Sequence, residues 1–251
     1  MGKIVEAAAS SRDLEGEVVF LTGAGGGLGQ SIVNGFLSAG VKRIIAANRQ
    51  SFAWQSSAVE PLILDITDLQ GVRAAAKKYA QLTDILINNA GLNHNANLLR
   101  STDTKLARRE MEVNYFGTIN MVREFGEVMR RRGNGTIVNI VSIGAQIAFP
   151  NMGSYCASKA ALHSMTQAIR AELNQSGICV MGVYPPAMDT RMSAHLDGSR
   201  KISPQQVAME LISALKHGGP EDVYVGPAAV LHDRLMREPK VVEAELGLRS
   251  V

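Results

Sequence analysis

The stretch YCASK at residues 155 to 159 places a tyrosine four positions before a lysine. In a helix this spacing puts Tyr155 and Lys159 on one face. At about 4 Å and an effective dielectric constant of about 20, an ammonium stabilises a phenolate by about 4 kcal/mol, which would lower the phenol pKa from about 10 toward about 7. We therefore expect Tyr155 to exchange protons as a catalytic acid or base. A tyrosine and a lysine on an exposed helix are the alternative interpretation.

Two further polar residues are placed to assist this tyrosine. Ser142 ends a β-branched stretch thirteen residues before Tyr155, where its hydroxyl can hydrogen-bond a carbonyl oxygen beside the phenol. Two donors on an oxygen that gains negative charge as hydride reaches its carbon stabilise the transition state more than the ground state. Asn114, in an expected helix, is placed to hold a water that links Lys159 to solvent. These residues predict proton and hydride transfer at a carbonyl group.

The stretch TGAGGGLG at residues 22 to 29 follows an apolar segment and precedes a helical pattern that begins at Leu28. Such a turn lets backbone amides approach a pyrophosphate at a helix N-terminus, where the helix dipole favours negative charge. Its GxxxGxG spacing differs from the GxGxxG fingerprint and from a P-loop. A tight turn that binds no ligand is therefore the alternative.

Asn48 and Arg49 stand about nineteen residues beyond this turn, where a dinucleotide-binding fold reads the adenosine ribose. An Asp or Glu there would accept hydrogen bonds from a free 2′-hydroxyl, whereas Arg can clamp a 2′-phosphate with two hydrogen bonds. The sequence therefore predicts NADP(H) as the cofactor, in preference to NAD(H). In the alternative, Arg49 points to solvent.

Short β-branched segments alternate with longer amphipathic segments along the chain. The expected strands are residues 17–21, 42–48, 61–65, 84–89, 135–142, 178–184 and 221–226. Because these strands are apolar along most of their length, the pattern predicts an α/β fold in which helices cover both faces of a parallel sheet. Ligands bind such sheets beyond the carboxyl ends of the strands. We expect one domain at residues 17–251 after a tail at residues 1–16.

The composition argues against several other classes of protein. The 26 basic and 23 acidic residues nearly balance, and the basic run at 130–132 lacks the interleaved aromatic residues of a nucleic-acid groove, so it is expected to be a solvated helix end. Cys156 and Cys179 have neither metal-site nor disulfide spacing. The first sixteen residues contain no apolar stretch long enough for a signal peptide or a membrane span. We expect a cytoplasmic protein without metal, nucleic-acid or membrane partners.

The glycine turn, the stretch NNAG at residues 88 to 91, Asn114, Ser142 and YCASK occur in this order, each at an expected strand end or in the adjoining helix. Together they resemble the short-chain dehydrogenase/reductase family in its single-domain form, over residues 17–226. The resemblance implies a doubly wound, Rossmann-like sheet of about seven parallel strands and a nicotinamide cofactor. It also implies that Tyr155 is the acid/base, that Lys159 also holds the nicotinamide ribose, that Ser142 orients the substrate and that Asn114 belongs to a proton relay.

The same resemblance assigns the walls of a cofactor groove. Asp65 and Ile66 would border the adenine, and a threonine after the sixth strand would meet the nicotinamide carboxamide. The family usually has Pro-Gly before that threonine; this chain has Pro185 followed by another proline, which lacks an amide hydrogen and restricts the loop. The expected cofactor residues are Gly23, Gly25, Gly26, Gly27, Leu28, Gly29, Asn48, Arg49, Asp65, Ile66, Asn89, Ala90, Gly91, Tyr155, Lys159, Pro185, Ala187, Met188 and Thr190.

We therefore expect an NADP(H)-dependent oxidoreductase, a carbonyl reductase or alcohol dehydrogenase, that acts on a small or medium ketone or aldehyde and its alcohol. A non-catalytic dinucleotide sensor is one alternative, although it would not need Ser142, Tyr155 and Lys159 together. An epimerase or dehydratase with the same YxxxK chemistry is another, although such relatives usually carry a larger C-terminal domain. Related enzymes commonly form dimers or tetramers, so a homo-oligomer is expected.

The substrate side is expected near the segment at residues 187–201. Apolar candidates for a pocket are Ile143, Ile147, Phe149, Met152, Met188 and Met192, unless they simply fill the core. Polar candidates after NNAG are His94, Asn95 and Asn97, although a loop histidine is more often exposed to solvent. Basic candidates for an acidic substrate are Arg191, Arg200 and Lys201.

Overall fold

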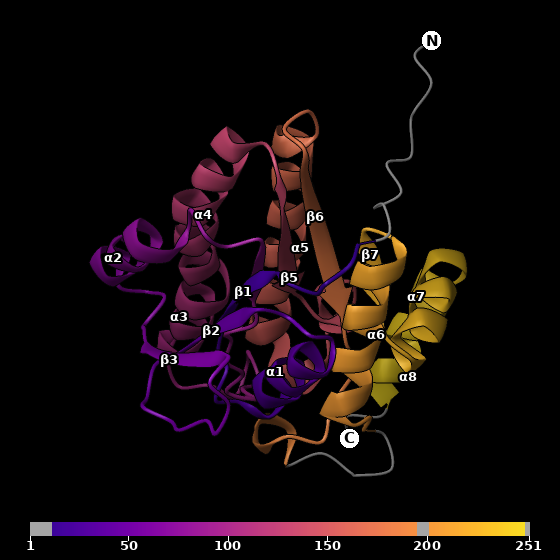
Figure 1. The fold of residues 1–251 in the computed structure, drawn as a ribbon. Coiled ribbons are helices and arrows are strands. Elements are labelled where there is room, and N and C mark those ends of the chain that lie inside the picture. The colour runs from indigo at the N-terminus through magenta and orange to yellow at the C-terminus, as the bar shows by residue number, and fades with distance from the viewer. Residues whose placement is uncertain (1–11, 195–200, 249–251) are drawn as a thin grey trace.

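A computed structural model describes residues 12–194 and 201–248, in which seven strands form a single parallel sheet (Figure 1). The strand order is β3-β2-β1-β4-β5-β6-β7. The strands are β1 (Val18–Thr22), β2 (Arg43–Asn48), β3 (Val59–Ile63), β4 (Ile85–Asn88), β5 (Gly135–Ile140), β6 (Ile178–Tyr184) and β7 (Asp222–Tyr224). The prediction of a doubly wound sheet of parallel strands is confirmed.

The central strands are apolar because both of their faces are covered. All residues of β4 and β5 are buried, and β1 is buried beyond its first residue. In the register of the sheet, Val19 of β1 pairs with Ile44 of β2 and with Ile85 of β4. This continuous burial explains why the strands read as unbroken hydrophobic runs rather than as alternating patterns.

Helices pack against the sheet in two layers. One layer contains α1 (Gly27–Ser38) and α6 (Pro204–His217), whose apolar residues share a core cluster with β1 and β2. The other layer contains α2 (Leu69–Tyr79), α4 (Thr118–Arg132) and α5 (Gly153–Leu173), which share a second cluster with the opposite face of the sheet. The chain leaves β1 toward β2 on one side and returns to β4 on the other, so the crevice for a ligand lies beyond the carboxyl ends of β1 and β4.

Shorter elements fill the edges of this frame. They are α3 (Lys105–Met111), the π-helical turn η1 (Glu112–Gly117), the 3-10 turns η2 (Ile143–Ala145), η3 (Pro150–Met152) and η4 (Arg191–Ser193), and the C-terminal helices α7 (Pro227–Arg237) and α8 (Pro239–Leu248). A third apolar cluster joins Leu235 of α7 and Val242 of α8 to Ile143 and Ile147. The C-terminal helices therefore pack against the segment that follows Ser142.

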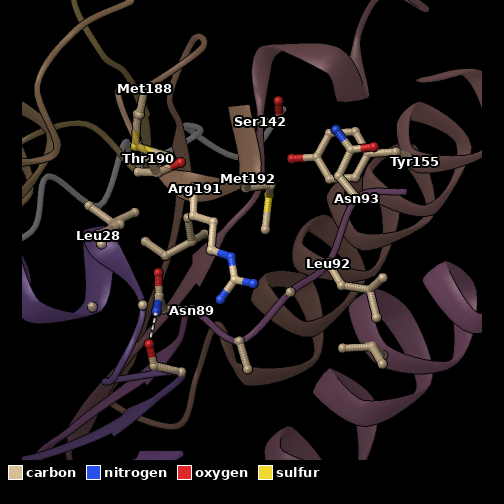
Figure 2. A pocket seen from close by; sticks show the side chains of 18 of the residues that line it. Leu28, Asn89, Leu92, Asn93, Ser142, Tyr155, Met188, Thr190, Arg191 and Met192 are labelled. Atoms are coloured by element: carbon tan, nitrogen blue, oxygen red, sulfur yellow. Dashed lines mark hydrogen bonds between the residues drawn. The ribbon is translucent and has the colours of Figure 1, made fainter. Parts of the chain in front are cut away.

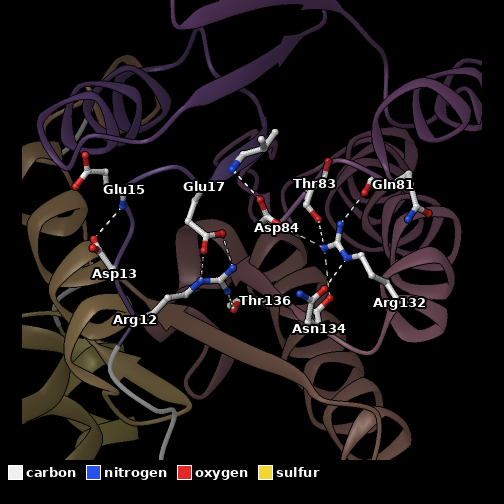
Figure 3. Close-up of polar contacts among 11 residues, drawn as sticks. Arg12, Asp13, Glu15, Glu17, Gln81, Thr83, Asp84, Arg132, Asn134 and Thr136 are labelled. Carbon is white, nitrogen blue, oxygen red and sulfur yellow. Dashed lines mark hydrogen bonds and ion pairs between the residues drawn. The ribbon is translucent and has the colours of Figure 1, made fainter.

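Arg12 and Leu14, which precede the expected domain start at residue 17, pack against the domain. Leu14 is 0% exposed and lies in the same core cluster as α1. Arg12 forms an ion pair with Glu17, and its guanidinium donates a 2.9 Å hydrogen bond to the Thr136 hydroxyl of β5 (Figure 3). Leu14 is a single apolar residue among polar neighbours, so the sequence contains no periodic pattern that predicts its burial.

The basic run at the end of α4 is only partly a solvated helix end. Arg130 and Arg131 are exposed and pair with Glu127. Arg132 instead turns toward the sheet, where its guanidinium donates to the backbone carbonyls of residues 81 and 83 and lies 3.5 Å from Asp84 (Figure 3). The expectation for 130–132 is therefore wrong for Arg132, because nearby carbonyls and a carboxylate replace its water.

Membrane insertion through a helix finds no support in the described part of the chain. None of its helices combines the length and the apolar composition needed to cross a bilayer.

We predict that Leu14→Ala lowers the free energy of unfolding by about 2–5 kcal/mol, because a buried leucine loses its packing and leaves a cavity. Urea unfolding followed by circular dichroism measures this change. Leu82→Ala is the matched control, since Leu82 is 51% exposed, and it should change stability by no more than about 0.5 kcal/mol. Equal effects of the two substitutions would contradict the packing of residues 12–16 onto the domain.

Candidate active site

A cavity of about 790 Å³ opens at the carboxyl ends of the strands, and most of the predicted site residues line it (Figure 2). The predicted residues on its wall are Gly23, Gly26, Gly27, Leu28, Gly29, Asn48, Arg49, Asp65, Ile66, Asn89, Ala90, Gly91, Ser142, Tyr155, Lys159, Pro185, Met188 and Thr190. Gly25, Asn114 and Ala187 are not on the wall. The structure thus brings together the two ends of a site that the sequence distributes over 168 residues, from 23 to 190.

The glycine turn is shaped by close backbone contacts. Gly23 has a φ of +66°, which a side chain would strain, and a Cβ there would lie 2.8 Å from Cα of Ala90. A Cβ on Gly29 would lie 2.2 Å from the carbonyl oxygen of Gly23. Because no side chain fits, the first turn of α1 can sit directly against the loop, and its free amides border the cavity. This cradle fits a pyrophosphate.

The loops after β1 and β4 are tied together by side chains. The Thr22 hydroxyl accepts hydrogen bonds of 3.0 Å from the backbone amides of Asn89 and Ala90. The Asn89 side-chain amide donates to the carbonyl oxygens of Thr22 and Gly23, also at 3.0 Å. The NNAG stretch therefore fixes the glycine turn, which is a structural role in addition to its place on the cavity wall.

The end of the cavity where we expect the adenosine carries two guanidinium groups. Arg49 and Arg109 both line it, and Arg109 lies 4.0 Å from the Asp65 carboxylate. Burial acts to raise the pKa of Asp65, but hydrogen bonds from Thr67, followed by the charges of Arg109 and Arg49, hold it below its ordinary value. Asn48 donates a 2.8 Å hydrogen bond to the carbonyl of Gln50. This end of the cavity thus offers positive charge beside an ionised carboxylate.

Gly25 lies next to Asn48 and is not on the cavity wall. A Cβ on Gly25 would lie 2.9 Å from Nδ2 of Asn48, so the glycine makes room for that side chain. Ala187 also does not line the cavity. Its backbone carbonyl accepts a 3.0 Å hydrogen bond from the amide of Ile202. Thr190 is the N-cap residue of η4, and its methyl group would lie 3.0 Å from a Cβ on Gly27. The loop after β6 therefore meets the glycine turn despite its second proline.

Lys159 belongs to α5, and its side chain is buried in the protein. Its side chain is nearly inaccessible, with 4% of the residue exposed, and Nζ donates a 2.8 Å hydrogen bond to the carbonyl of Ile140 at the end of β5. Burial lowers its pKa to about 8, because the ammonium loses water that one carbonyl only partly replaces. Lys159 can therefore lose a proton more easily than an ordinary lysine.

The expected lowering of the Tyr155 pKa is wrong. Nζ of Lys159 lies 5.9 Å from the centre of the Tyr155 ring and is directed at Ile140. Burial raises the pKa of Tyr155 to about 12, and the opposing hydrogen bond with Ser142 is too weak to reverse this effect. Helical spacing places the two residues on one face but does not set the direction of the ammonium. The phenol is therefore protonated at neutral pH and is ready to donate.

Ser142 stands where Tyr155 points, as Figure 2 shows. The serine is the N-cap residue of η2, and its Oγ accepts a 3.0 Å hydrogen bond from the backbone amide of Gly144. From behind, Gln146 donates to the Tyr224 hydroxyl, and its Oε1 lies 2.6 Å from Nδ1 of His232, whose ring stacks on Tyr224 at 3.9 Å. The C-terminal helix α7 thus helps to hold the segment that carries the serine.

Asn114 lies close to Lys159 without touching the cavity. Its side chain is fully buried in the π-helical turn, where it accepts a 2.8 Å hydrogen bond from the amide of Leu92 and donates to the Leu92 carbonyl and the Ser158 hydroxyl. A Cβ on Gly91 would lie 3.2 Å from Oδ1 of Asn114 and 3.5 Å from Nζ of Lys159. Its part in a water relay stays a prediction.

The expected substrate pocket is only partly correct. Met188, Met192, Asn95 and Arg191 line the cavity. Ile143 and Ile147 are core residues that pack against α7 and α8, because the segment after Ser142 turns them inward. The remaining predicted substrate residues that do not line the cavity are Phe149, Met152, His94, Asn97 and Lys201. His94 is exposed, in line with the alternative, and Arg200 lies outside the described residues.

Several wall residues had not been predicted. They are Leu64, Leu92, Asn93, Arg109, Val113, Ile140, Val141, Pro186 and Ala194. Leu92 and Asn93 directly follow NNAG, so extending that loop would have found them. Arg109 and Val113 are four residues apart, on one face of the helix that leads to Asn114. This shared helical face is a sequence pattern that predicts both residues, but the motifs do not include it.

Comparisons with known proteins agree with this geometry. The family description "short chain dehydrogenase" matches residues 17–201, so the chain belongs to the short-chain dehydrogenase/reductase family and is an oxidoreductase by family. A short chain dehydrogenase from Burkholderia cenocepacia, solved in complex with NADP, superposes with a TM-score of 0.88 at 37% identity and covers 94% of this chain and 99% of its own. A 3-ketoacyl-(acyl-carrier-protein) reductase from Brucella melitensis, complexed with NADH, gives 0.75 at 27%, covering 84% and 97%.

Curated relatives give the same family. The probable oxidoreductase EphD from Mycobacterium tuberculosis is 30% identical over 224 residues, which is 82% of this chain. The chain spans only 38% of the length of that relative. An uncharacterized oxidoreductase from Staphylococcus saprophyticus is 30% identical over 233 residues, covering 87% of this chain and 98% of its own length. The two solved relatives named above were determined with NADP and with NADH, so each binds a nicotinamide dinucleotide.

We predict that Gly29→Ala weakens dinucleotide binding at least about tenfold, because the new methyl group must displace the Gly23 carbonyl from the cradle. Fluorescence titration with NADPH measures the affinity. Gly126→Ala is the matched control: the glycine lies in α4, away from the cavity, and its Cβ would meet Ile137 at an ordinary 3.4 Å. Unchanged binding by Gly29→Ala would contradict the cradle.

Proposed function

We propose that this protein is an NADP(H)-dependent reductase of a small or medium ketone or aldehyde, working also as an alcohol dehydrogenase in reverse. The observation that carries the proposal is that a single cavity is lined by Ser142 and Tyr155, beyond β5, and by Arg49, beyond β2. Cytoplasmic location and assembly as a homo-oligomer remain predictions.

The residues present fit the cofactor. The glycine cradle between residues 23 and 29 would hold the pyrophosphate, Asp65 and Ile66 the adenine, and Arg49 the 2′-phosphate. Thr190, Tyr155 and Lys159 border the end where a nicotinamide would lie. The bound cofactor supplies or accepts the hydride. That the relative from Burkholderia cenocepacia was solved with NADP supports the choice of the phosphorylated form.

The chain itself supplies the proton. Tyr155 donates from its hydroxyl to the carbonyl oxygen as that oxygen gains negative charge, and Ser142 donates a second hydrogen bond to the same atom. The ammonium of Lys159 is directed at Ile140 before the reaction. The phenolate, once formed, would attract this ammonium and be stabilised by its charge. Because burial lowers the pKa of Lys159 to about 8, its ammonium can return a proton to the phenolate at neutral pH.

A panel of ketones and aldehydes assayed with NADPH tests this function. We expect turnover of at least one carbonyl compound and a loss of about 100-fold or more in kcat for Tyr155→Phe, because the aromatic ring keeps its packing and loses its proton. NADPH binding without turnover of any member, and unaltered by Tyr155→Phe, would instead favour a dinucleotide sensor. Tightly held cofactor with no net NADPH consumption would favour an epimerase or dehydratase.

We predict that Arg49→Gln raises KM for NADPH about tenfold or more and leaves KM for NADH unchanged, because only the 2′-phosphate needs the guanidinium. Initial rates with both cofactors measure the ratio. Arg123→Gln is the matched control, since Arg123 is exposed on α4 and does not line the cavity. Equal or better use of NADH by the unsubstituted protein would refute the preference.

We predict that kcat for carbonyl reduction stays constant at neutral pH and falls as the pH rises through about 8. Tyr155 keeps its proton over this range because its pKa is raised to about 12, whereas Lys159 loses its charge near its lowered pKa of about 8. In Lys159→Arg the residual activity should lose this alkaline limb, because a guanidinium stays charged. A limb centred near pH 7 (about the value first expected for the phenol), or one that persists in Lys159→Arg, would contradict the assignment.

A further inference from the structure

Glu110 is a buried carboxylate that the reaction described above does not use. It lies in α3 and is 0% exposed. Oε1 accepts a 2.7 Å hydrogen bond from the backbone amide of His94, and Oε2 accepts a 2.5 Å hydrogen bond from the hydroxyl of Ser154. Removing a carboxylate from water costs several kcal/mol unless such partners replace the solvent. Both oxygens of the buried Glu110 carboxylate have partners, so its role depends on where those partners lie.

The two partners of Glu110 belong to opposite sides of the reaction site. His94 stands between Asn93 and Asn95, whose side chains line the cavity. Around it the chain makes a tight turn, in which Asn95 has a φ of +53° and its amide donates a 2.8 Å hydrogen bond to Oδ1 of Asn93. Ser154 directly precedes Tyr155 in the first turn of α5. Glu110 therefore spans from the cavity wall to the tyrosine.

The contact between this loop and the segment formed by η3 and the start of α5 extends beyond Glu110. The Asn97 side chain donates hydrogen bonds of 3.2 and 3.1 Å to the carbonyl of Pro150 and to Oδ1 of Asn151. Leu98 packs on Gly153, where a Cβ would lie 2.8 Å from its side chain. The outer contacts are exposed, whereas the bonds made by Glu110 are buried and shielded from competing water. Glu110 is thus the interior part of this contact.

Glu110 also acts on the electrostatics of the tyrosine. Burial is the largest influence that raises the pKa of Tyr155, and the negative charge of Glu110 adds to it. Lys159 is the cation facing the ring from the same helix, and Ser142 contributes a neutral hydroxyl from η2. The carboxylate thus favours the protonated phenol that carbonyl reduction requires.

We propose that Glu110 is a positioning residue for the reaction: by holding His94 and Ser154 at once, it fixes the wall at residues 93–95 relative to Tyr155 and so sets how a carbonyl group is presented to the phenol. The inference rests on the proposed role of Tyr155 as the acid/base. Without this link the wall and α5 can separate, and a displacement of about 1 Å in a reacting pair can cost about 100-fold in rate.

Three variants of the full chain test the link. Glu110→Ala removes both hydrogen bonds, and Ser154→Ala removes only the bond to α5. Glu110→Gln keeps both, because its carbonyl can accept from His94 while its amide donates to Ser154. Glu112→Ala is the matched control, two residues away and exposed. NADPH affinity should stay unchanged in all four variants, since Glu110 does not line the cavity.

In carbonyl reduction we expect kcat to fall about 10- to 100-fold in Glu110→Ala and several-fold in Ser154→Ala, because only alignment is lost. Glu110→Gln should recover activity to within about threefold of the original, because it restores the contacts. The double variant Glu110→Ala with Ser154→Ala should be no worse than Glu110→Ala alone, since both act through one link. Full kcat in Glu110→Ala, or additive losses, would overturn the inference.

Hydrogen exchange followed by mass spectrometry separates this inference from the proposed function. Amides of residues 92–95 and of the first turn of α5 should exchange faster in Glu110→Ala and Ser154→Ala, and at the original rate in Glu112→Ala. A chain that reduces no carbonyl compound would remove the proposed function even if exchange changes as expected. Unchanged exchange in Glu110→Ala, or changed exchange with unaltered kcat, would overturn the role of Glu110 alone.

Discussion

The ammonium of Lys159 lies in the protein interior, where its hydrogen bond to Ile140 joins α5 to the end of β5. A buried charge is unfavourable unless its surroundings are fixed, so this one contact constrains much of the site. Gly91 packs closely here, because a Cβ there would lie 3.2 Å from Oδ1 of Asn114, a tight contact, and 3.5 Å from Nζ. Asn114 reaches the same place from a π-helical turn, an irregularity common at functional sites. The site thus contains a buried cation whose loss of water is unfavourable for folding.

Much of the fold followed from the sequence because its signals are local. Strands buried on both faces read as continuous apolar runs, and the polar stretches that follow them mark the carboxyl edge of the sheet. The glycine turn, NNAG and YCASK each specify a backbone shape or a helical face over a few residues. For this reason most of the residues that we expected at a cofactor line one cavity, whereas Gly25 and Ala187 do not.

Properties that depend on distant contacts did not follow from the sequence. Spacing placed Lys159 and Tyr155 on one face but could not show that Nζ turns to Ile140, so the pKa of the phenol was expected to fall and is instead raised. Ile143 and Ile147 were candidates for a pocket, yet α7 and α8 cover them. The substrate half of the cavity is shaped by such contacts, including those of Glu110. The C-terminal helices thus pack against the segment that follows Ser142, and no local motif predicts this position.

Replacement of Lys159 by methionine tests the central claim most directly, because the side chain keeps much of its volume and loses its charge. Single-turnover reduction of a carbonyl compound by NADPH, measured across the pH range, is the appropriate experiment. The account predicts a rate lower by about 100-fold or more and an unfolding free energy that is not reduced, since a buried charge has been removed. Full activity with the pH profile of the original protein would contradict it.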